Sequence, residues 1–103
     1  MSLALIIDNG FINQSRFELR SRKSFECIWS IDLGKGWGYR CASLDHSGWI
    51  VADSYNYRLI HIINNVTIDK IDNYSTKPFN VIHWSDDQIV IRTIEGLNMH
   101  PCK

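Results

Sequence analysis

The chain has almost no helical periodicity. Its apolar residues fall in short runs rich in Ile, Val, Trp, Tyr and Phe, and turn-forming residues separate these runs. Runs of this length and composition between turn signals are typical of antiparallel β-strands. The expected strands are Leu3–Ile7, Phe11–Asn13, Phe17–Arg20, Phe25–Ile31, Tyr39–Leu44, Trp49–Ala52, Arg58–Ile63, Val66–Ile71, Phe79–Trp84, Gln88–Ile94 and Leu97–His100. The sequence therefore predicts an all-β fold, an antiparallel meander of hairpins that is either partial-propeller-like or a β-sandwich.

A weak recurrence along the chain bears on this choice. Ile50-Val51 recurs as Ile89-Val90 at an offset of 39 residues, and the same offset leads back to Phe11-Ile12. The spacing is close to that of one propeller blade, so the units are either three blade-like meanders or a chance recurrence of hairpins. A closed propeller usually needs at least four blades, which this length does not hold.

Length and composition set the class of molecule. The 103 residues make one domain, 1–103, and 45% hydrophobic with 12% aromatic residues can fill a core. Eleven basic and eleven acidic side chains give no net charge to draw the chain to nucleic acid or to a membrane. No run approaches the roughly 20 apolar residues that cross a bilayer, and the N-terminal run reads as a strand rather than a signal peptide. We expect a cytoplasmic protein.

Cofactor and metal motifs do not appear. Cys27, Cys41 and Cys102 have unrelated spacings, unlike a zinc site or a disulfide framework. The glycine-rich segment 34–38 is not followed by a helix, which a phosphate-binding loop requires. We expect no cofactor and no metal, and a flexible loop in which Trp37 is either a recognition tip or part of the core.

Catalysis is not indicated either. Asp45, His46 and Ser47 are consecutive, so their side chains diverge and do not form a relay. His61 and His83 fall within expected strands. We expect no catalytic residue and no enzyme, and a small hydrolase or nuclease that uses one of these histidines stays a third-ranked alternative.

Basic residues gather near the N-terminus. Arg16, Glu18 and Arg20 alternate with Phe17 and Leu19, the pattern of a strand with one wet face. Because the charges fit a solvated sheet edge, we interpret them as an edge strand rather than as an RNA-binding strip.

Large amphipathic side chains and acids gather in the expected connections. Tyrosine and tryptophan supply contact area at low entropic cost, and carboxylates supply steering and register. Loops of this kind on a rigid β scaffold often form a protein-binding face. Trp37, in the glycine-rich loop, belongs to the same group. The candidate partner-binding residues are Trp37, Asp53, Tyr55, Tyr57, Asp72, Tyr74, Asp86 and Asp87.

Residues 48–62 resemble a single NHL repeat of the β-propeller kind. The matching positions are Gly48, Ile50, Val51, Ala52, Asp53, Asn56, Arg58 and Leu59. The resemblance implies a strand, a polar turn and a second strand, with the acid, the amide and the arginine satisfying the backbone groups of the turn.

In overall character the chain is similar to the small immunity proteins of bacterial contact-dependent growth inhibition systems. The common points are the length, the lack of catalytic and cofactor motifs, and the abundance of aromatics and loop acids. The resemblance implies a 1:1 complex with a cognate toxin domain, often a nuclease, whose active site is covered by acidic and aromatic loops. The alternative is a structural module, an incomplete propeller that is completed by oligomerisation or by a partner chain.

Overall fold

The structure, a computed structural model, describes residues 2–9, 14–36, 39–44, 48–63 and 67–101. The described residues form ten β-strands in three antiparallel sheets, without a helix, which confirms the all-β prediction. They contain no helix long and apolar enough to cross a membrane. The first sheet is β1 (Ser2–Asn9), β2 (Gln14–Ser21) and β3 (Cys27–Lys35); the second is β4 (Arg40–Ser43), β5 (Trp49–Asp53), β6 (Arg58–Ile62) and β7 (Ile68–Asn73); the third is β8 (Asn80–Ser85), β9 (Gln88–Thr93) and β10 (Gly96–Pro101).

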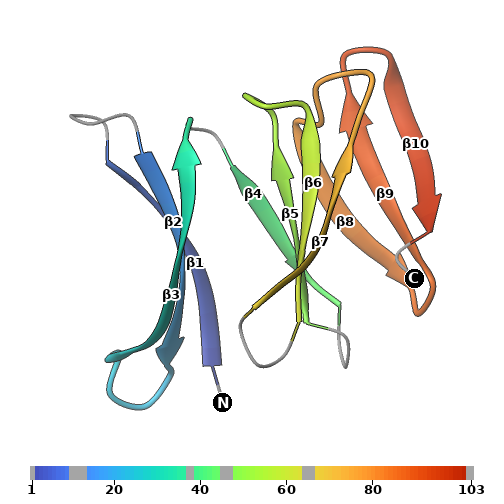
Figure 1. The fold of residues 1–103 in the computed structure, drawn as a ribbon. Helices are drawn as coiled ribbons and strands as arrows, with labels where there is room; N and C mark the ends of the chain where they lie inside the picture. The colour runs from blue at the N-terminus through green and yellow to red at the C-terminus, as the bar shows by residue number, and fades with distance from the viewer. Residues whose placement is uncertain (1, 10–13, 37–38, 45–47, 64–66, 102–103) are drawn as a thin grey trace.

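The three sheets stack face to face in chain order, with the second sheet in the middle (Figure 1). Each sheet is a meander in which neighbouring strands are also neighbours in sequence. The result is three layers of hairpin sheets, one more than a two-layer sandwich has.

Two hydrophobic cores lie between the sheets. The middle sheet contributes to both of them, which is why β5 and β6 are buried along almost their whole length, as strands covered on both faces are. The first core contains Phe17, Leu19, Leu33, Tyr39, Val51, Ile60 and Ile62, and the second contains Leu44, Ile50, Ala52, Leu59, Val81, Ile89 and Ile91.

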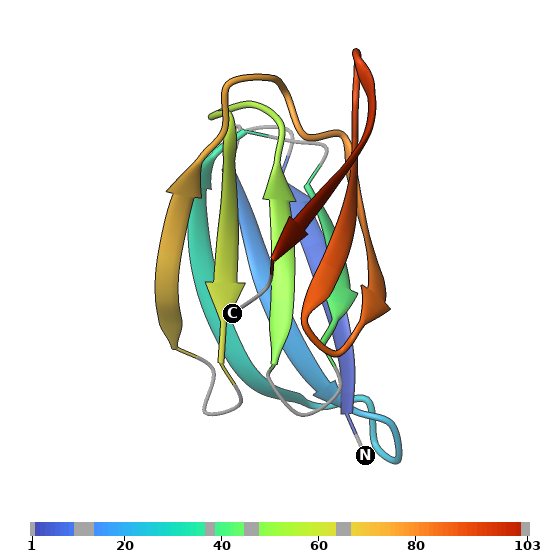
Figure 2. The same cartoon turned by 90° about the vertical axis from the view of Figure 1, so that its right-hand side faces the viewer.

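Strand direction shows that the three sheets are not exact repeats. β4 and β8 run in the same direction, and β1 runs in the opposite one (Figures 1 and 2). The recurrence in the sequence therefore relates the second sheet to the third, where β5 begins at Trp49 and β9 at Gln88. Phe11-Ile12, the third member of the recurrence, lies outside the described residues.

Two local expectations were wrong. β3 continues to Lys35, so Gly34 is inside a strand and does not start a loop. Gly34 has φ 85°, which fits the β-bulge that shifts the register opposite Ser15 and Arg16. The arginine-bearing strand, β2, lies at the centre of the first sheet and not at an edge. Its charged residues face away from the middle sheet because Phe17 and Leu19 occupy the other face.

Candidate interaction surface

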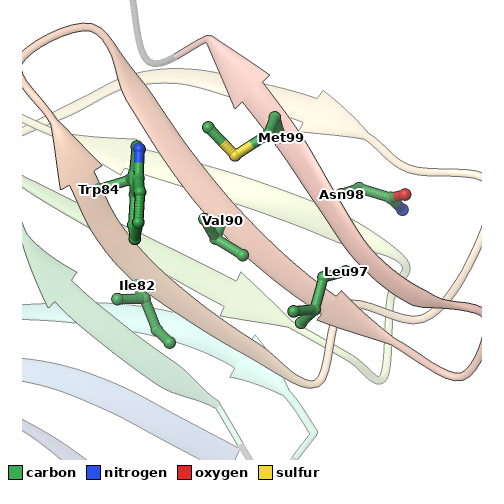
Figure 3. A pocket seen from close by; sticks show the side chains of 6 residues that line it. All are labelled: Ile82, Trp84, Val90, Leu97, Asn98 and Met99. Carbon is green, nitrogen blue, oxygen red and sulfur yellow. The ribbon is translucent and has the colours of Figure 1, made fainter.

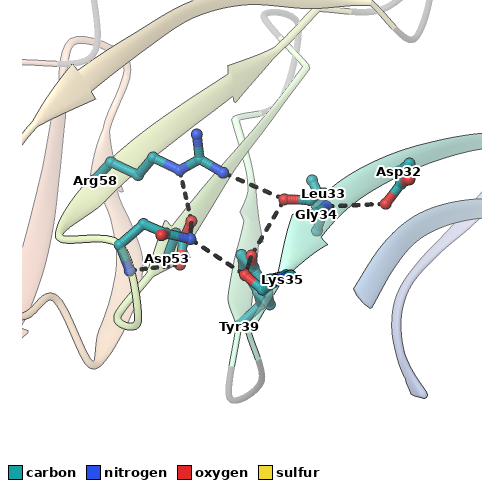
Figure 4. Close-up of polar contacts among 8 residues, drawn as sticks. Asp32, Leu33, Gly34, Lys35, Tyr39, Asp53 and Arg58 are labelled. Atoms are coloured by element: carbon teal, nitrogen blue, oxygen red, sulfur yellow. Dashed lines mark hydrogen bonds and ion pairs between the residues drawn. The ribbon is translucent and has the colours of Figure 1, made fainter. Parts of the chain in front are cut away.

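Asp53 ends β5, and its buried carboxylate organises the turn that follows. Its Oδ1 accepts the backbone N–H of Asn56 at 3.1 Å, and its Oδ2 accepts Asn56 Nδ2 at 2.9 Å and Arg58 Nε at 2.6 Å (Figure 4). These are the acid, amide and arginine that the NHL resemblance concerns, and they surround a turn between two strands. Asp53 is fully buried, so its carboxylate does not lie on the surface where we expected a partner contact.

The same turn joins the second sheet to the first. Arg58 Nη2 donates to the carbonyl of Leu33 at 3.2 Å, and Asn56 Nδ2 donates to that of Lys35 at 3.2 Å. The Tyr39 hydroxyl donates to both carbonyls, at 3.2 and 3.0 Å (Figure 4). Burial raises the pKa of Tyr39, because the phenolate is less well solvated there than in water. The polar cluster therefore has a structural role, which is to fix two sheets relative to each other.

Tyr55 and Tyr57 are exposed on this turn. The Lys77 ammonium lies 5.7 Å from the centre of the Tyr57 ring, and the Tyr57 carbonyl accepts the N–H of Tyr74 at 2.7 Å. Tyr74 packs against the second core and is partly buried. These three tyrosines lie at one end of the stack, where β5 and β7 end.

Asp72 lies near the same end. Its Oδ2 is 3.8 Å from His100 Nε2 and 3.9 Å from Lys70 Nζ. The His100 ring also packs edge-on against the Tyr74 ring, with 5.9 Å between the ring centroids. The end of β10 therefore packs against the end of β7 here. Asp72 is thus engaged within the chain, although it stays partly exposed.

Asp86 and Asp87 form the turn between β8 and β9, at the opposite end of the stack from the tyrosines (Figure 1). Trp37 lies outside the described residues. The expected partner-binding residues therefore do not form one surface: Tyr55, Tyr57, Asp72 and Tyr74 lie at one end, Asp86 and Asp87 at the other, and Asp53 is inside. Their role in binding stays a prediction.

A different surface, which the sequence reasoning missed, is the outer face of the third sheet. Trp84 and Leu97 are 69% and 70% exposed, and Ile82 and Met99 are exposed by more than half. With Val90 and Asn98 these side chains line a shallow groove of about 440 Å³ (Figure 3). We call the five apolar residues Ile82, Trp84, Val90, Leu97 and Met99 the open face.

The sequence did carry a signal for the open face. Ile89, Val90 and Ile91 are consecutive, so β9 is apolar on both faces, as is the Val81-Ile82 pair of β8. A strand that is apolar on both sides is normally covered on both sides. Ile89, Ile91 and Val81 face the middle sheet, and nothing among the described residues covers Val90 and Ile82 in the same way.

The outer face of the first sheet is mixed. Charged side chains of β2 occupy its centre, and Leu3, Leu5 and Ile7 of β1 lie beside them on the same face. Glu18 is almost completely buried between two arginines, with Arg16 Nε at 2.5 Å and Arg20 Nη2 at 2.8 Å. The hydrogen bond from Arg16, followed by that from Arg20, lowers the pKa of Glu18 even though burial opposes the shift. Asp32 lies opposite Arg16 on β3 and adds a further charge. The outer face of the first sheet therefore has a charged centre, whereas the open face on the third sheet is apolar.

Groups for catalysis or metal binding are few. His61 Nδ1 lies 3.2 Å from a carboxylate oxygen of Asp69. Within the described ranges, no three His, Cys, Asp or Glu side chains lie close enough to hold a metal ion.

Comparisons of the chain with protein-family models, with curated proteins and with solved structures find no match.

Proposed function

We propose that this chain is an assembly module, a partial-propeller-like stack that is extended when another β-sheet packs on the open face. The observation that supports the proposal is the contrast between the two sides of the third sheet. One side is buried in the second core, and the other presents Ile82, Trp84 and Leu97 to solvent. The added sheet would come from a second copy or from a partner chain.

The contacts inside the molecule support this assignment. The middle sheet is held from both sides by aliphatic side chains of its neighbours, through Val51 on one face and Ile50 on the other. The third sheet carries the same kind of side chains on both faces, but the described residues cover only one of them. Contiguous exposed apolar residues of this kind mark interaction sites on soluble proteins.

The energetic reason is hydrophobic. Full burial of a Leu, Ile or Met side chain contributes about 1.5–3 kcal/mol, and an aromatic side chain brings about 150–250 Å² of contact area. Trp84 and Leu97 retain most of their accessible surface. Covering the open face therefore provides a favourable free energy of association, centred on an aromatic residue of the type that dominates interfaces.

Hydroxyl-radical footprinting at low and high protein concentration, and with any candidate partner, tests the proposal. Trp84 and Met99 are both readily oxidised and both belong to the open face. Trp29, exposed to 52% on the first sheet, is a matched internal control. We expect assembly to protect Trp84 and Met99 from oxidation while Trp29 reacts at an unchanged rate.

Equal protection of all three residues would mean that the contact lies elsewhere or is non-specific. Unchanged oxidation of Trp84 in a complex whose formation is shown independently would contradict the proposal.

A second candidate function, inhibition of a toxin domain, is favoured by the tyrosine end of the stack. Tyr55 and Tyr57 are exposed close to Tyr74, which gives aromatic contact area at this end. Asp72 adds a partly exposed carboxylate, which here lies near Lys70. In an inhibition assay with a cognate nuclease domain, Tyr55→Ala with Tyr57→Ala should weaken inhibition at least about tenfold, which is 1.4 kcal/mol or more. Trp84→Ser is the matched control and should leave inhibition unchanged. Full inhibition by the tyrosine double variant would remove this end as the binding site.

A further inference from the structure

We infer that the occupant of the open face is a second copy of this chain, packed in a two-fold dimer with the strands of the two third sheets antiparallel. This inference rests on the proposed function, since it takes the open face as the docking surface. It adds the partner and its orientation. Charge and the chemistry of the outer face of the first sheet support it, and size sets its expected strength.

The register of the third sheet defines the layout of the face. Ile82 pairs with Val90, and Val90 pairs with Met99, so these three side chains form a row across the middle of the sheet. In the next row Arg92 lies between Asn80 and Leu97. Because strand residues rise about 3.3 Å each, Arg92 lies about 7 Å from the central row along the strands.

Arg92 is the charged residue on this face. It alternates with buried Ile91 and Thr93, so it projects outward, and it is exposed. Among the described residues it has no ion-pair partner. Asp87, in the β8–β9 turn, is exposed. By the same rise per residue it lies about 10 Å from the central row, on the side opposite Arg92.

A two-fold axis along the Ile82–Val90–Met99 row brings these opposite charges together. The rotation reverses the strand direction, so Arg92 of each copy comes beside the acidic turn of the other. Asp87 and its neighbour Asp86 then face a guanidinium across both ends of the interface, and the two apolar centres meet between them. Packing with the strands parallel would place Arg92 against Arg92 and the acids against acids, which is unfavourable.

Head-to-tail stacking is disfavoured by the charged centre of the outer face of the first sheet. Arg16, Glu18 and Arg20 lie there with Asp32 on one side, and aliphatic residues of β1 lie on the other side. Covering it with Trp84 and Leu97 would remove charged groups from water without new partners, which is costly. The open face is therefore matched better by itself than by the outer face of the first sheet with its charged centre, and a two-fold arrangement also closes.

Size sets the expected strength. Three strands of six residues cover roughly 14 by 20 Å at the usual strand spacing and rise. Stable interfaces bury about 800 Å² on each partner, which is more than this footprint gives. We therefore expect a weak, reversible dimer with a dissociation constant on the order of 10 μM to 1 mM.

Sedimentation equilibrium over about 5 μM to 1 mM at low salt tests the inference. The variants are Trp84→Ser, Arg92→Asp, Asp87→Arg, and the exchange of both charges. We expect Trp84→Ser to abolish the dimer. Each single charge variant should raise the dissociation constant about tenfold, and the double exchange should restore it to within about threefold of the wild type. Far-ultraviolet circular dichroism and thermal melts verify that every variant is folded.

The failures are distinguishable. A wild-type chain that stays a single copy at 1 mM overturns the second-copy inference, while the proposed function survives if a partner chain protects Trp84 from oxidation. A dimer that is lost with Trp84→Ser but does not respond to the charge variants overturns the antiparallel orientation. A dimer unaffected by Trp84→Ser overturns both the inference and the use of the open face for self-assembly.

Discussion

Asp53 holds two of the side chains that join the first two sheets, Asn56 and Arg58. Its buried carboxylate accepts three hydrogen bonds, and removing it leaves Arg58 with no counter-ion in a mostly buried position. Breaking such a pair from one side is more costly than the pair's net contribution, because the remaining charge has lost its compensation.

Asp53→Ala should therefore lower the free energy of unfolding by about 3 kcal/mol in urea denaturation, toward the low end for a buried pair because Arg58 is partly exposed. Glu26→Ala, at an exposed carboxylate before β3, is the control and should cost less than about 0.5 kcal/mol. A loss for Asp53→Ala as small as that of the control would contradict the structural role.

Glu18 gives the fold a defined acid sensitivity. Its folded-state pKa is lowered below the ordinary value of 4.5, chiefly by the hydrogen bond from Arg16. A lowered pKa means that the stabilisation is fully present above pH 4.5 and is lost as the pH falls through the folded-state value.

Between pH 5 and pH 3, roughly, the unfolding free energy of the wild type should fall more steeply than that of Glu18→Gln. The comparison is made by denaturant melts at each pH, with Glu26→Gln as a variant that keeps the wild-type slope. Parallel pH profiles for wild type and Glu18→Gln would show that Glu18 does not contribute.

At the level of single residues, local chemistry was predictable and exposure was not. The strand–turn–strand at Asp53, Asn56 and Arg58 followed from residues close in sequence. Whether the Asp53 carboxylate faced solvent or the first sheet depended on Leu33 and Lys35, which are about twenty residues away. The sequence contains no local signal for that contact.

At the scale of secondary-structure elements, the residue directly before β5 has to be a glycine. Gly48 has φ +104°, and a Cβ there would lie 2.1 Å from the carbonyl oxygen of Ile62 on β6. The backbone of a paired strand cannot move away as a flexible side chain can. Gly34 also has a positive φ, +85°, but nothing lies within 4 Å of its added Cβ.

Substitutions at these two glycines separate the energetic cost of a steric clash from that of backbone strain. Gly34→Ala should cost about 1 kcal/mol, from the unfavourable φ alone, whereas Gly48→Ala should cost at least about 3 kcal/mol because the clash adds to it. Thermal or urea melts of the two variants measure the difference. Equal losses would mean that β5 and β6 separate easily at this point.

The strands themselves were largely predictable, because period-two patterns and turn residues are local. Their neighbours were harder to predict. β2 has charges on one face, which we interpreted as the pattern of an edge strand, yet it lies between β1 and β3, with Arg16 and Arg20 paired with Glu18 on the outer face. Position in a sheet depends on pairing, and an alternating pattern reports only which face is wet.

For the whole molecule, the chain is a stack of three sheets whose two outer faces differ, one with a charged centre and one apolar. The sequence predicted an all-β meander of hairpins and left a partial-propeller-like arrangement and a β-sandwich open. The open face was not predicted, because an apolar strand pair such as Ile82 and Val90 has the pattern of ordinary core. The exposure of these residues depends on what packs against the outer face of the third sheet, which no local pattern encodes.

The most direct test is small-angle X-ray scattering of the wild type and Trp84→Ser over a concentration series. At high dilution both should give a radius of gyration close to the 13.2 Å of the Cα atoms of one chain. The account predicts that the value rises with concentration for the wild type and stays constant for Trp84→Ser. Identical curves for the two proteins at every concentration would contradict self-association through the open face.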